Sequence, residues 1–296
     1  MVQSLNLNEP SCGSLDRSTA LYQLAKLKAW NVETALDWPN LVVRQDFPFT
    51  REGNLFAGYA EYEALGRSQQ IELAWLQHSQ DIGDILYGER TALVLTAQIL
   101  SALNDSGDQL FLASQVLDEA RHIEFFSRYQ SAISRHSFPP ARELVNFFTA
   151  VAAVNDADAK LLACQAVLEP LAMVRFRRLR CHSRVPLLRK ALGYIARDEA
   201  RHTAFGTHYL ACRFQQLNVS ERQVKMQEFY RLARQLGDNP ARYLNIAARF
   251  GFDLHQLLAH LRSRRSIDRS GRQQLQHQMQ MSLLKMNLTM VNPGSA

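Results

Sequence analysis

The chain has 296 residues, of which 47% are hydrophobic and 21% are charged, a composition typical of a globular protein with a packed core. Its 13 glycines and 9 prolines are few for this length, which excludes collagen-like and low-complexity sequences and disfavours a fold of many short strands. The 34 Lys and Arg residues exceed the 28 Asp and Glu residues, and the net charge of +6 suits an acidic partner without identifying one.

In chain order, residues 1–17 show little periodicity and are predicted to form a mobile arm. A helix then begins near Leu21 and ends near Trp30, and residues 36–50, with two prolines, are predicted to wrap irregularly. From Glu61 onward, apolar residues recur at steps of three and four, which indicates helices.

The helices predicted from this periodicity form one all-α domain over residues 1–296. Residues 103–109 form a loop in which Ser106 or Asp108 is a candidate N-cap for the next helix, which ends near His136. Further helices are predicted at about 141–154, 159–181, 187–217, 220–236 and 240–250, and again from 253. The expected fold is a four-helix bundle with additional helices, a core at about 61–217 and a mobile end at 287–296.

Four cysteines, Cys12, Cys164, Cys181 and Cys212, are too sparse and too irregularly spaced for a disulfide framework or a zinc knuckle. The amino-terminal residues do not resemble a signal peptide, so we expect free thiols and a cytoplasmic location. The longest charge-free run covers 14 residues, 91–104, fewer than the roughly 18 that suggest a membrane span. We therefore expect no membrane association.

A repeated pentapeptide marks the candidate site. The sequence Asp-Glu-Ala-Arg-His occurs at 118–122 and again at 198–202, so that Glu and His stand three residues apart and share one face of a helix. Each copy's glutamate is preceded by another glutamate 30 residues earlier, Glu89 and Glu169. This spacing suits a helix, a turn and a return helix, and its duplication predicts a pseudo-twofold four-helix bundle.

Such a bundle would bring four carboxylates and two imidazoles together in its core. The candidate ligands are Glu89, Glu119, His122, Glu169, Glu199 and His202. A glutamate from each of two helices plus Glu-x-x-His from each of the other two is a known arrangement for two iron or manganese ions. Four buried carboxylates without cations would repel one another, and oxygen and imidazole donors favour Fe(II) or Mn(II). Apolar neighbours such as Leu112 and Ile195 argue against the alternative of two surface helices with salt bridges.

The other positions of the repeat are expected to support the ligands. Asp118 and Asp198 either accept the outer N–H of the histidine from the opposite half, or are exposed helix acids. Arg121 and Arg201 are expected to be ion-pair partners. Pro170 directly follows a candidate ligand and is expected to distort the preceding turn, with either a mobile glutamate or a tolerated kink as the result.

These motifs resemble the ferritin-like dimetal carboxylate oxidases and oxygenases. Residues 21–38 and 195–209 also look like the branch that contains the ribonucleotide reductase small subunit and the ligand-binding oxidases. The para-aminobenzoate N-oxygenases and the soluble acyl-carrier-protein desaturases share the ligand pattern. The resemblance, over about residues 20–215, implies two iron ions or a manganese–iron pair, O2 as co-substrate and an external electron donor.

Three sites depart from these relatives. Phe126 stands where the reductase small subunit usually carries its radical tyrosine, which weakens a radical-generating interpretation. Cys164 and Leu93 stand where ligand-binding oxidases form a tyrosine–valine crosslink, so that crosslink cannot form here. Ile195 stands where the N-oxygenases carry an extra histidine, so a six-ligand site is expected. Together with Phe205, the first three residues either line an apolar substrate pocket or belong to the core.

The predicted function is an oxygenase or oxidase that activates O2 to oxidise an organic substrate. Hydroxylation, N-oxygenation, desaturation and C–C chemistry remain open, and so do a radical-generating subunit and a ferroxidase or iron-storage protein. Basic runs at 175–190 and 262–272 are either solvated helix faces or a docking surface for an acidic carrier protein with a tethered substrate. A nucleic acid is disfavoured because aromatic residues are not interleaved with these runs. We expect a homodimer.

Overall fold

The computed structural model describes residues 14–41, 43–134, 136, 138–233, 240–267, 277, 279–281, 283–284 and 286. Among these residues there is no strand, which confirms the all-α prediction; an isolated antiparallel bridge joins Phe49 and Ser183. The first helix, α1, spans Ser14–Lys28, so residues 14–17 are helical rather than part of an arm. The remainder of the predicted mobile ends, 1–13 and 287–296, lies outside the described residues.

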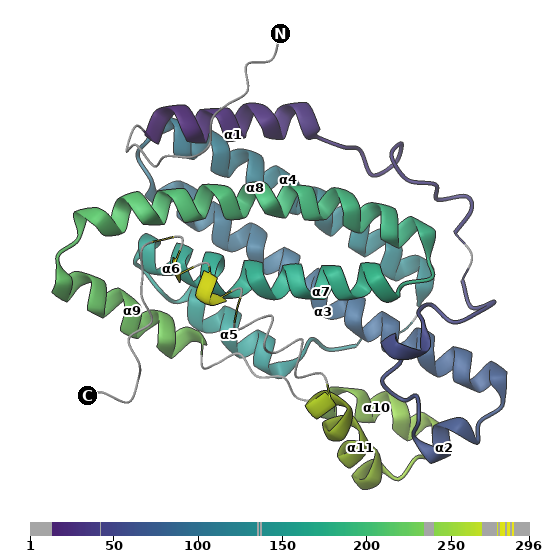
Figure 1. The fold of residues 1–296 in the computed structure, drawn as a ribbon. Helices are drawn as coiled ribbons and strands as arrows, with labels where there is room; N and C mark the ends of the chain where they lie inside the picture. The colour runs from purple at the N-terminus through teal and green to yellow at the C-terminus, as the bar shows by residue number, and fades with distance from the viewer. Residues whose placement is uncertain are drawn as a thin grey trace.

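The four-helix bundle predicted from the repeat is present (Figure 1). Its long segments are α3 (Arg67–Ala102), α4 (Ser106–Ile133), α6 (Ala157–Ala163) continued by a π-helical turn (Cys164–Leu168) and α7 (Glu169–His182), and α8 (Pro186–Gln216). Helix α3 packs along α4, and α7 packs along α8. Each copy of the repeat therefore occupies one helix pair.

The start of α4 differs from the prediction. Asp105 is the N-cap, because it keeps an extended backbone and its carboxylate accepts a hydrogen bond from the Asp108 backbone N–H at 3.0 Å. The Asp108 carboxylate instead accepts a hydrogen bond from the Ser18 hydroxyl at 2.6 Å. This bond ties α1, which lies across the top of the bundle in Figure 1, to α4.

Shorter helices cover the bundle. Helices α5 (Arg142–Ala152) and α9 (Val219–Ala233) pack on α6. The single helix predicted at 240–250 is wrong, because η3 (Pro240–Tyr243), α10 (Leu244–Ala247) and η4 (Ala248–Phe250) replace it. They pack beside α11 (Leu254–Ile267) and share an apolar cluster with α2 (Ala60–Glu63), at the lower right in Figure 1. The 3-10 turn η1 (Arg51–Gly53) packs on α7. No helix in the described part of the chain is long and apolar enough to cross a membrane.

Two apolar clusters divide the bundle along its length. On α4, one cluster contains Phe111 and Leu112 and the other contains Phe125 and Phe126; the buried polar residues Gln115, Asp118, Glu119 and His122 lie between them. Helix α8 repeats this order in reverse: its buried apolar residues between Leu187 and Ile195 belong to the second cluster, and Phe205, Leu210 and Phe214 belong to the first. The pentapeptide repeats therefore form one buried polar layer between two apolar layers.

Candidate metal centre

All six predicted ligands lie in this polar layer and are buried. Glu89 comes from α3, Glu119 and His122 from α4, Glu169 from the first residue of α7, and Glu199 and His202 from α8. The most exposed of them, Glu169, shows only 8% of its surface to solvent. On each helix the ligands lie on the same face as the apolar stripe, and this face packs toward the core. The spacing of the ligands along the sequence therefore predicts the site.

The ligand atoms fall into two overlapping groups. The first contains Glu89, Glu119, His122 and Glu199, and the second contains Glu169, Glu199 and His202; within each group, one ligand atom per residue lies within 4.8 Å of all the others. Glu199 belongs to both groups. Glu119 also approaches the second group, since its Oε1 lies 3.5 Å from Nδ1 of His202. Two overlapping groups of carboxylate and imidazole donors fit the ligand set of a dinuclear centre.

Both histidines turn the same nitrogen toward the carboxylates. Nδ1 of His122 lies 3.3 Å from Oε2 of Glu89, and Nδ1 of His202 lies 3.0 Å from Oε2 of Glu199. Each Nε2 points outward to an aspartate. With Nε2–H donating to that aspartate, Nδ1 keeps a lone pair directed at the carboxylates, which is the tautomer that binds a metal.

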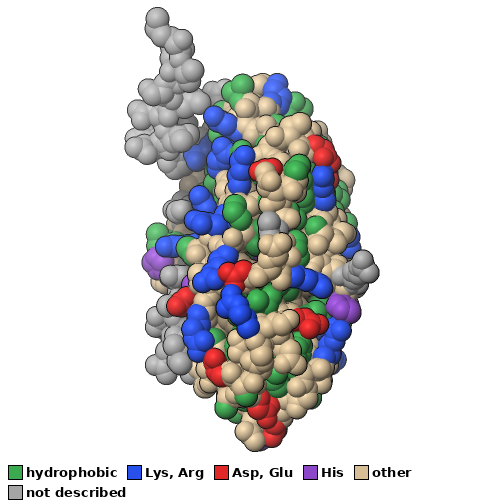
Figure 2. Space-filling view, turned by 90° about the vertical axis from the view of Figure 1, so that its right-hand side faces the viewer, with side chains coloured by type: hydrophobic (Ala, Val, Ile, Leu, Met, Phe, Trp, Pro, Cys, Tyr) green, Lys and Arg blue, Asp and Glu red, His purple; other side chains and the backbone are tan. Residues whose placement is uncertain are grey.

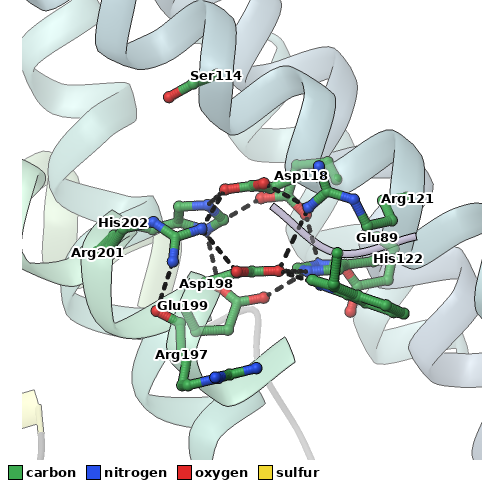
Figure 3. Close-up of polar contacts among 12 residues, drawn as sticks. Glu89, Ser114, Asp118, Arg121, His122, Arg197, Asp198, Glu199, Arg201 and His202 are labelled. Atoms are coloured by element: carbon green, nitrogen blue, oxygen red, sulfur yellow. Dashed lines mark hydrogen bonds and ion pairs between the residues drawn. The ribbon is translucent and has the colours of Figure 1, made fainter. Parts of the chain in front are cut away.

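Each aspartate accepts a hydrogen bond from the histidine of the other helix pair, as predicted. Nε2 of His122, on α4, donates to Asp198 of α8 at 3.2 Å, and Nε2 of His202, on α8, donates to Asp118 of α4 at 3.3 Å. Figure 3 shows Asp118 and Asp198 between the two histidines. Burial alone would raise the pKa of Asp198, but the hydrogen bond from His122 lowers it below its usual value. Both aspartates are therefore ionised hydrogen-bond acceptors, not exposed helix acids.

Both arginines of the repeat are ion-pair partners, as expected. Arg201 donates to Asp118 at 2.9 Å and to Asp198 at 2.6 Å, while Arg121 donates to Asp118 at 2.7 Å (Figure 3). Sequence reasoning missed Trp30, whose indole N–H donates to Asp198 at 2.8 Å. The signal available for Trp30 was its place in the segment 21–38, which carries part of the family resemblance.

The buried glutamates of the site are unfavourable without cations beside them. Burial, opposed by the His122 hydrogen bond and reinforced by neighbouring carboxylates, raises the pKa of Glu89 to about 8. Burial and then repulsion from Glu199 raise the pKa of Glu169 well above its usual value. Oε2 of Glu119 and Oε2 of Glu169 are buried and have no hydrogen-bond partner among the described residues. Two divalent ions would neutralise these groups and coordinate the unpartnered oxygens, so the donor set fits a pair of iron or manganese ions.

The turn before Glu169 is distorted, as its proline predicts. Residues Cys164–Leu168 form a π-helical turn, and Pro170 lies in the first turn of α7. Isolated π turns within helices are often found at functional sites. Gln165 of this turn packs directly on Gly206 of α8, where an added Cβ would lie only 2.1 Å from the Gln165 Cδ. Whether Glu169 is mobile stays a prediction.

The four residues that depart from the relatives, and Phe205, are all buried or partly buried. Phe126 and Ile195 are fully buried in one apolar cluster, whereas Phe205 and Cys164 belong to the other, and Leu93 is partly buried. Burial raises the pKa of the Cys164 thiol. A pocket of about 280 Å³ lies elsewhere, beside residues 138–143 and Arg242. The substrate pocket predicted to be lined by Leu93, Phe126, Cys164 and Phe205 therefore stays a prediction.

Comparisons with known proteins agree with this geometry. Residues 15–283 match the family described as P-aminobenzoate N-oxygenase AurF. An R2-like ligand-binding oxidase variant with an anaerobically reconstituted Mn/Fe cofactor has a TM-score of 0.61 and 18% identity, covering 97% of this chain and 96% of that chain. The R2-like ligand-binding oxidase from Sulfolobus acidocaldarius has a TM-score of 0.53 and 15% identity, covering 92% of each chain. No curated protein sequence matches the chain.

At such identities the solved structures establish the shared helical fold, while the family match covers most of the sequence. The chain belongs to the P-aminobenzoate N-oxygenase AurF family and is an oxidoreductase of the dimetal-carboxylate class.

Proposed function

We propose that this chain holds two iron ions, or a manganese–iron pair, and uses O2 to oxidise a small organic substrate. The proposed ligands are Glu89, Glu119, His122, Glu169, Glu199 and His202, of which Glu199 belongs to both groups of donor atoms and Glu119 approaches both. The observation that carries the proposal is the convergence of these six buried side chains from four helix segments on two overlapping positions. When bound, the metal pair would supply the electrons that activate O2.

The surrounding residues have defined tasks in this proposal. Asp198 and Asp118 accept the Nε2–H of His122 and His202, which leaves each Nδ1 free to bind a metal. Arg201 donates hydrogen bonds to both aspartates and so fixes their positions. Carboxylates tolerate changes in metal charge because they can bind through one oxygen or two. The apolar layers on either side exclude water, which limits loss of the oxidant to solvent.

Oxygen transfer to the nitrogen of a small aromatic amine is the reaction that the family's name favours. Ile195, fully buried, stands where N-oxygenases carry an additional histidine, so we propose that the reaction proceeds with six ligands. The substrate is free in solution or tethered to a carrier protein. Para-aminobenzoate and its ring-substituted analogues are the first compounds to test.

The decisive experiment counts metals and follows oxygen. Anaerobic loading with Fe(II) should give about two ions per chain, and the loaded protein should consume O2 and oxygenate an aromatic amine. Glu119→Ala and Glu199→Ala should each lose at least one ion and abolish oxygen consumption. Glu124→Ala is the matched control, because Glu124 is an exposed residue of the same helix α4.

Three outcomes would contradict the proposal. Full metal content and activity in both ligand variants would remove the six-ligand assignment. Uptake of many more than two ions per chain would favour iron storage. A stable protein radical passed to a partner enzyme, without substrate oxygenation, would favour a radical-generating subunit.

The partners and the compartment are part of the same proposal. An external donor returns two electrons for each O2, and a cytoplasmic location suits thiols such as those of Cys164 and Cys181, which form no disulfide among the described residues. Exposed Leu27 of α1 and Leu117 of α4, at 79% and 61% exposure, offer apolar contacts to a second copy of the chain. Sedimentation of the loaded protein tests the homodimer.

A further inference from the structure

One segment of the chain carries basic residues and no acidic residue. Between Glu169 and Asp198, residues 170–197 contain neither Asp nor Glu. The eight basic residues of the segment are Arg175, Arg177, Arg178, Arg180, Arg184, Arg189, Lys190 and Arg197. The chain as a whole carries 28 acidic residues, so this absence concentrates positive charge on α7 and the first half of α8.

The positive charge is exposed and shared by both helices. Seven of the eight residues, all except Arg175, are exposed, and we call these seven the α7–α8 basic surface. Arg180 of α7 reaches across to α8, where its Cζ lies 3.9 Å from the Cβ position of Gly193. Lys190 and Arg197, seven residues apart, lie on the same face of α8. Figure 2 looks onto the end of the molecule where α7 and α8 meet, and Lys and Arg side chains gather on its left half.

This surface is connected to the candidate metal centre by packed side chains. The Arg197 guanidinium lies over the Tyr194 ring, 4.6 Å from its centroid. The Tyr194 ring stacks on Trp30 with a centroid separation of 5.2 Å. The Trp30 N–H donates to Asp198, which also accepts the hydrogen bond from the candidate ligand His122. A partner that covers Arg197 would therefore be linked to His122 by a series of direct contacts through Tyr194, Trp30 and Asp198.

We propose that the α7–α8 basic surface docks a small acidic electron-transfer protein. The inference rests on the proposed function, which needs an external source of electrons. Charge complementarity selects an acidic partner, and the contact from Arg197 to His122 favours a redox protein over a substrate carrier. Each docked partner is oxidised by one electron, and two encounters supply the two electrons that return two trivalent ions to the divalent state.

A reduced plant-type [2Fe–2S] ferredoxin is a suitable acidic probe for the metal-loaded protein. Binding measured by calorimetry at low ionic strength should weaken as salt rises, because exposed charges are screened. The double variant Arg180→Glu/Lys190→Glu should weaken binding roughly tenfold or more, through the loss of complementary charge. The rate at which the reduced ferredoxin loses its electron to the loaded protein, followed by stopped-flow absorbance, should fall by a similar factor.

The control is Arg142→Glu/Arg249→Glu, an equal change of charge at exposed residues of α5 and η4. It should change ferredoxin affinity less than twofold. Equal weakening by both double variants, or no ferredoxin binding, would overturn the docking proposal. Tighter binding of an acidic acyl carrier protein or of duplex DNA to the same surface would also overturn it. Metal content and O2 consumption with dithionite as reductant, measured on the unaltered protein, test the proposed function separately.

Discussion

At the scale of residues, the aspartates of the two repeats determine how the histidines face the site. Asp198 accepts hydrogen bonds from Trp30, His122 and Arg201, and Arg201 links it to Asp118 (Figure 3). An asparagine at this position would have to present its NH2 group to at least one of these three donors. If the NH2 group faces His122, the histidine loses the acceptor that fixes its tautomer and orientation; if it faces Arg201, the neutral amide oxygen left for His122 is a weaker acceptor than a carboxylate.

Asp198→Asn should therefore weaken metal binding by roughly 10–100-fold while the ligands themselves are unchanged. A competitive titration with a chromogenic chelator measures the affinity of each ion. Asp37→Asn is the control, because Asp37 is exposed and accepts a local hydrogen bond from the Asn40 side chain. Equal affinities in Asp198→Asn and the unaltered protein would mean that Asp198 does not position His122.

Phe126 separates an oxygenase from a radical-generating subunit. It lies four residues after His122 on α4, is fully buried, and packs against Phe125 with a centroid separation of 5.0 Å. A phenylalanine has no phenolic hydrogen to give up. We therefore expect no tyrosyl radical at this position after the loaded protein meets O2 without substrate.

Phe126→Tyr should instead be oxidised or hydroxylated, since the new ring would lie one helical turn from a ligand. Electron paramagnetic resonance and intact mass on both proteins make the measurement. A long-lived tyrosyl signal in the unaltered protein would favour the radical-generating function. A Phe126→Tyr protein that is inert toward O2 would place residue 126 outside the reach of the oxidant.

At the scale of elements, the contact between the π-helical turn and α8 sets how closely these two segments approach. Gln165 fills the space that a side chain at position 206 would occupy: a Cβ on Gly206 would lie 2.1 to 2.6 Å from three Gln165 side-chain atoms. Gln165 is 1% exposed and has little room to move. Gly206 therefore permits the approach of the turn that precedes Glu169.

Gly206→Ala should destabilise the protein by about 1–3 kcal/mol, the usual cost of overpacking. Shortening Gln165 to alanine in the double variant should recover part of this loss, which a double-mutant cycle from urea unfolding measures. Gly83→Ala in α3 is the control, because its Cβ meets nothing within 4 Å, and it should be neutral or stabilising. Additive effects at 165 and 206 would contradict the contact.

The elements that the sequence predicted are those whose signal is periodic. The apolar stripe of α3, the two Glu-x-x-His pairs and the spacing of 30 residues all repeat, so the bundle and its six candidate ligands could be derived from them. The N-cap at Asp105 could not be distinguished from Ser106, because both residues suit that role and one extended backbone angle decides. The contact of Gln165 with Gly206 joins distant positions, and no local pattern encodes it.

At the scale of the whole molecule, the polar layer between the two apolar clusters makes stability depend on metal. The candidate ligands in this layer are four glutamates and two histidines, and without metal ions the glutamate charges repel one another or are suppressed by proton uptake. Cations that bind the folded site but not the unfolded chain must raise the free energy of unfolding.

Saturating Fe(II) under anaerobic conditions should therefore raise the melting temperature. One site at a free metal concentration 100 times its Kd adds about 2.7 kcal/mol to the free energy of unfolding. Differential scanning calorimetry of the metal-free and loaded proteins measures the change, and Glu199→Ala should respond less. An unchanged melting temperature in the unaltered protein at saturating Fe(II) would count against a buried site.

Stability also depends on pH through His78, which lies outside the polar layer. Its ring is fully buried among Trp75, Phe49 and Tyr129, and Nε2 lies 2.9 Å from the Tyr129 hydroxyl. Burial lowers the pKa of His78 to about 3. The pKa in the folded state is thus below that in the unfolded chain, about 6.5. Above about pH 6.5 His78 is neutral in both states and does not reduce stability. Below that pH the unfolded chain takes up a proton that the folded protein does not, so stability falls.

Between pH 7.5 and pH 5.5, His78 should therefore cost the folded state about 1.4 kcal/mol. His78→Gln remains neutral and keeps a hydrogen-bonding group for Tyr129, so the metal-free variant should lose that much less stability over the same interval. Urea unfolding of both metal-free proteins at the two pH values isolates this difference, because the carboxylates of the polar layer are common to both. The imidazole resonances of His78 in the unaltered protein provide a test that does not depend on the variant folding. Protonation of the ring near pH 6.5, or an identical loss of stability in both proteins, would show that His78 is not held neutral by burial.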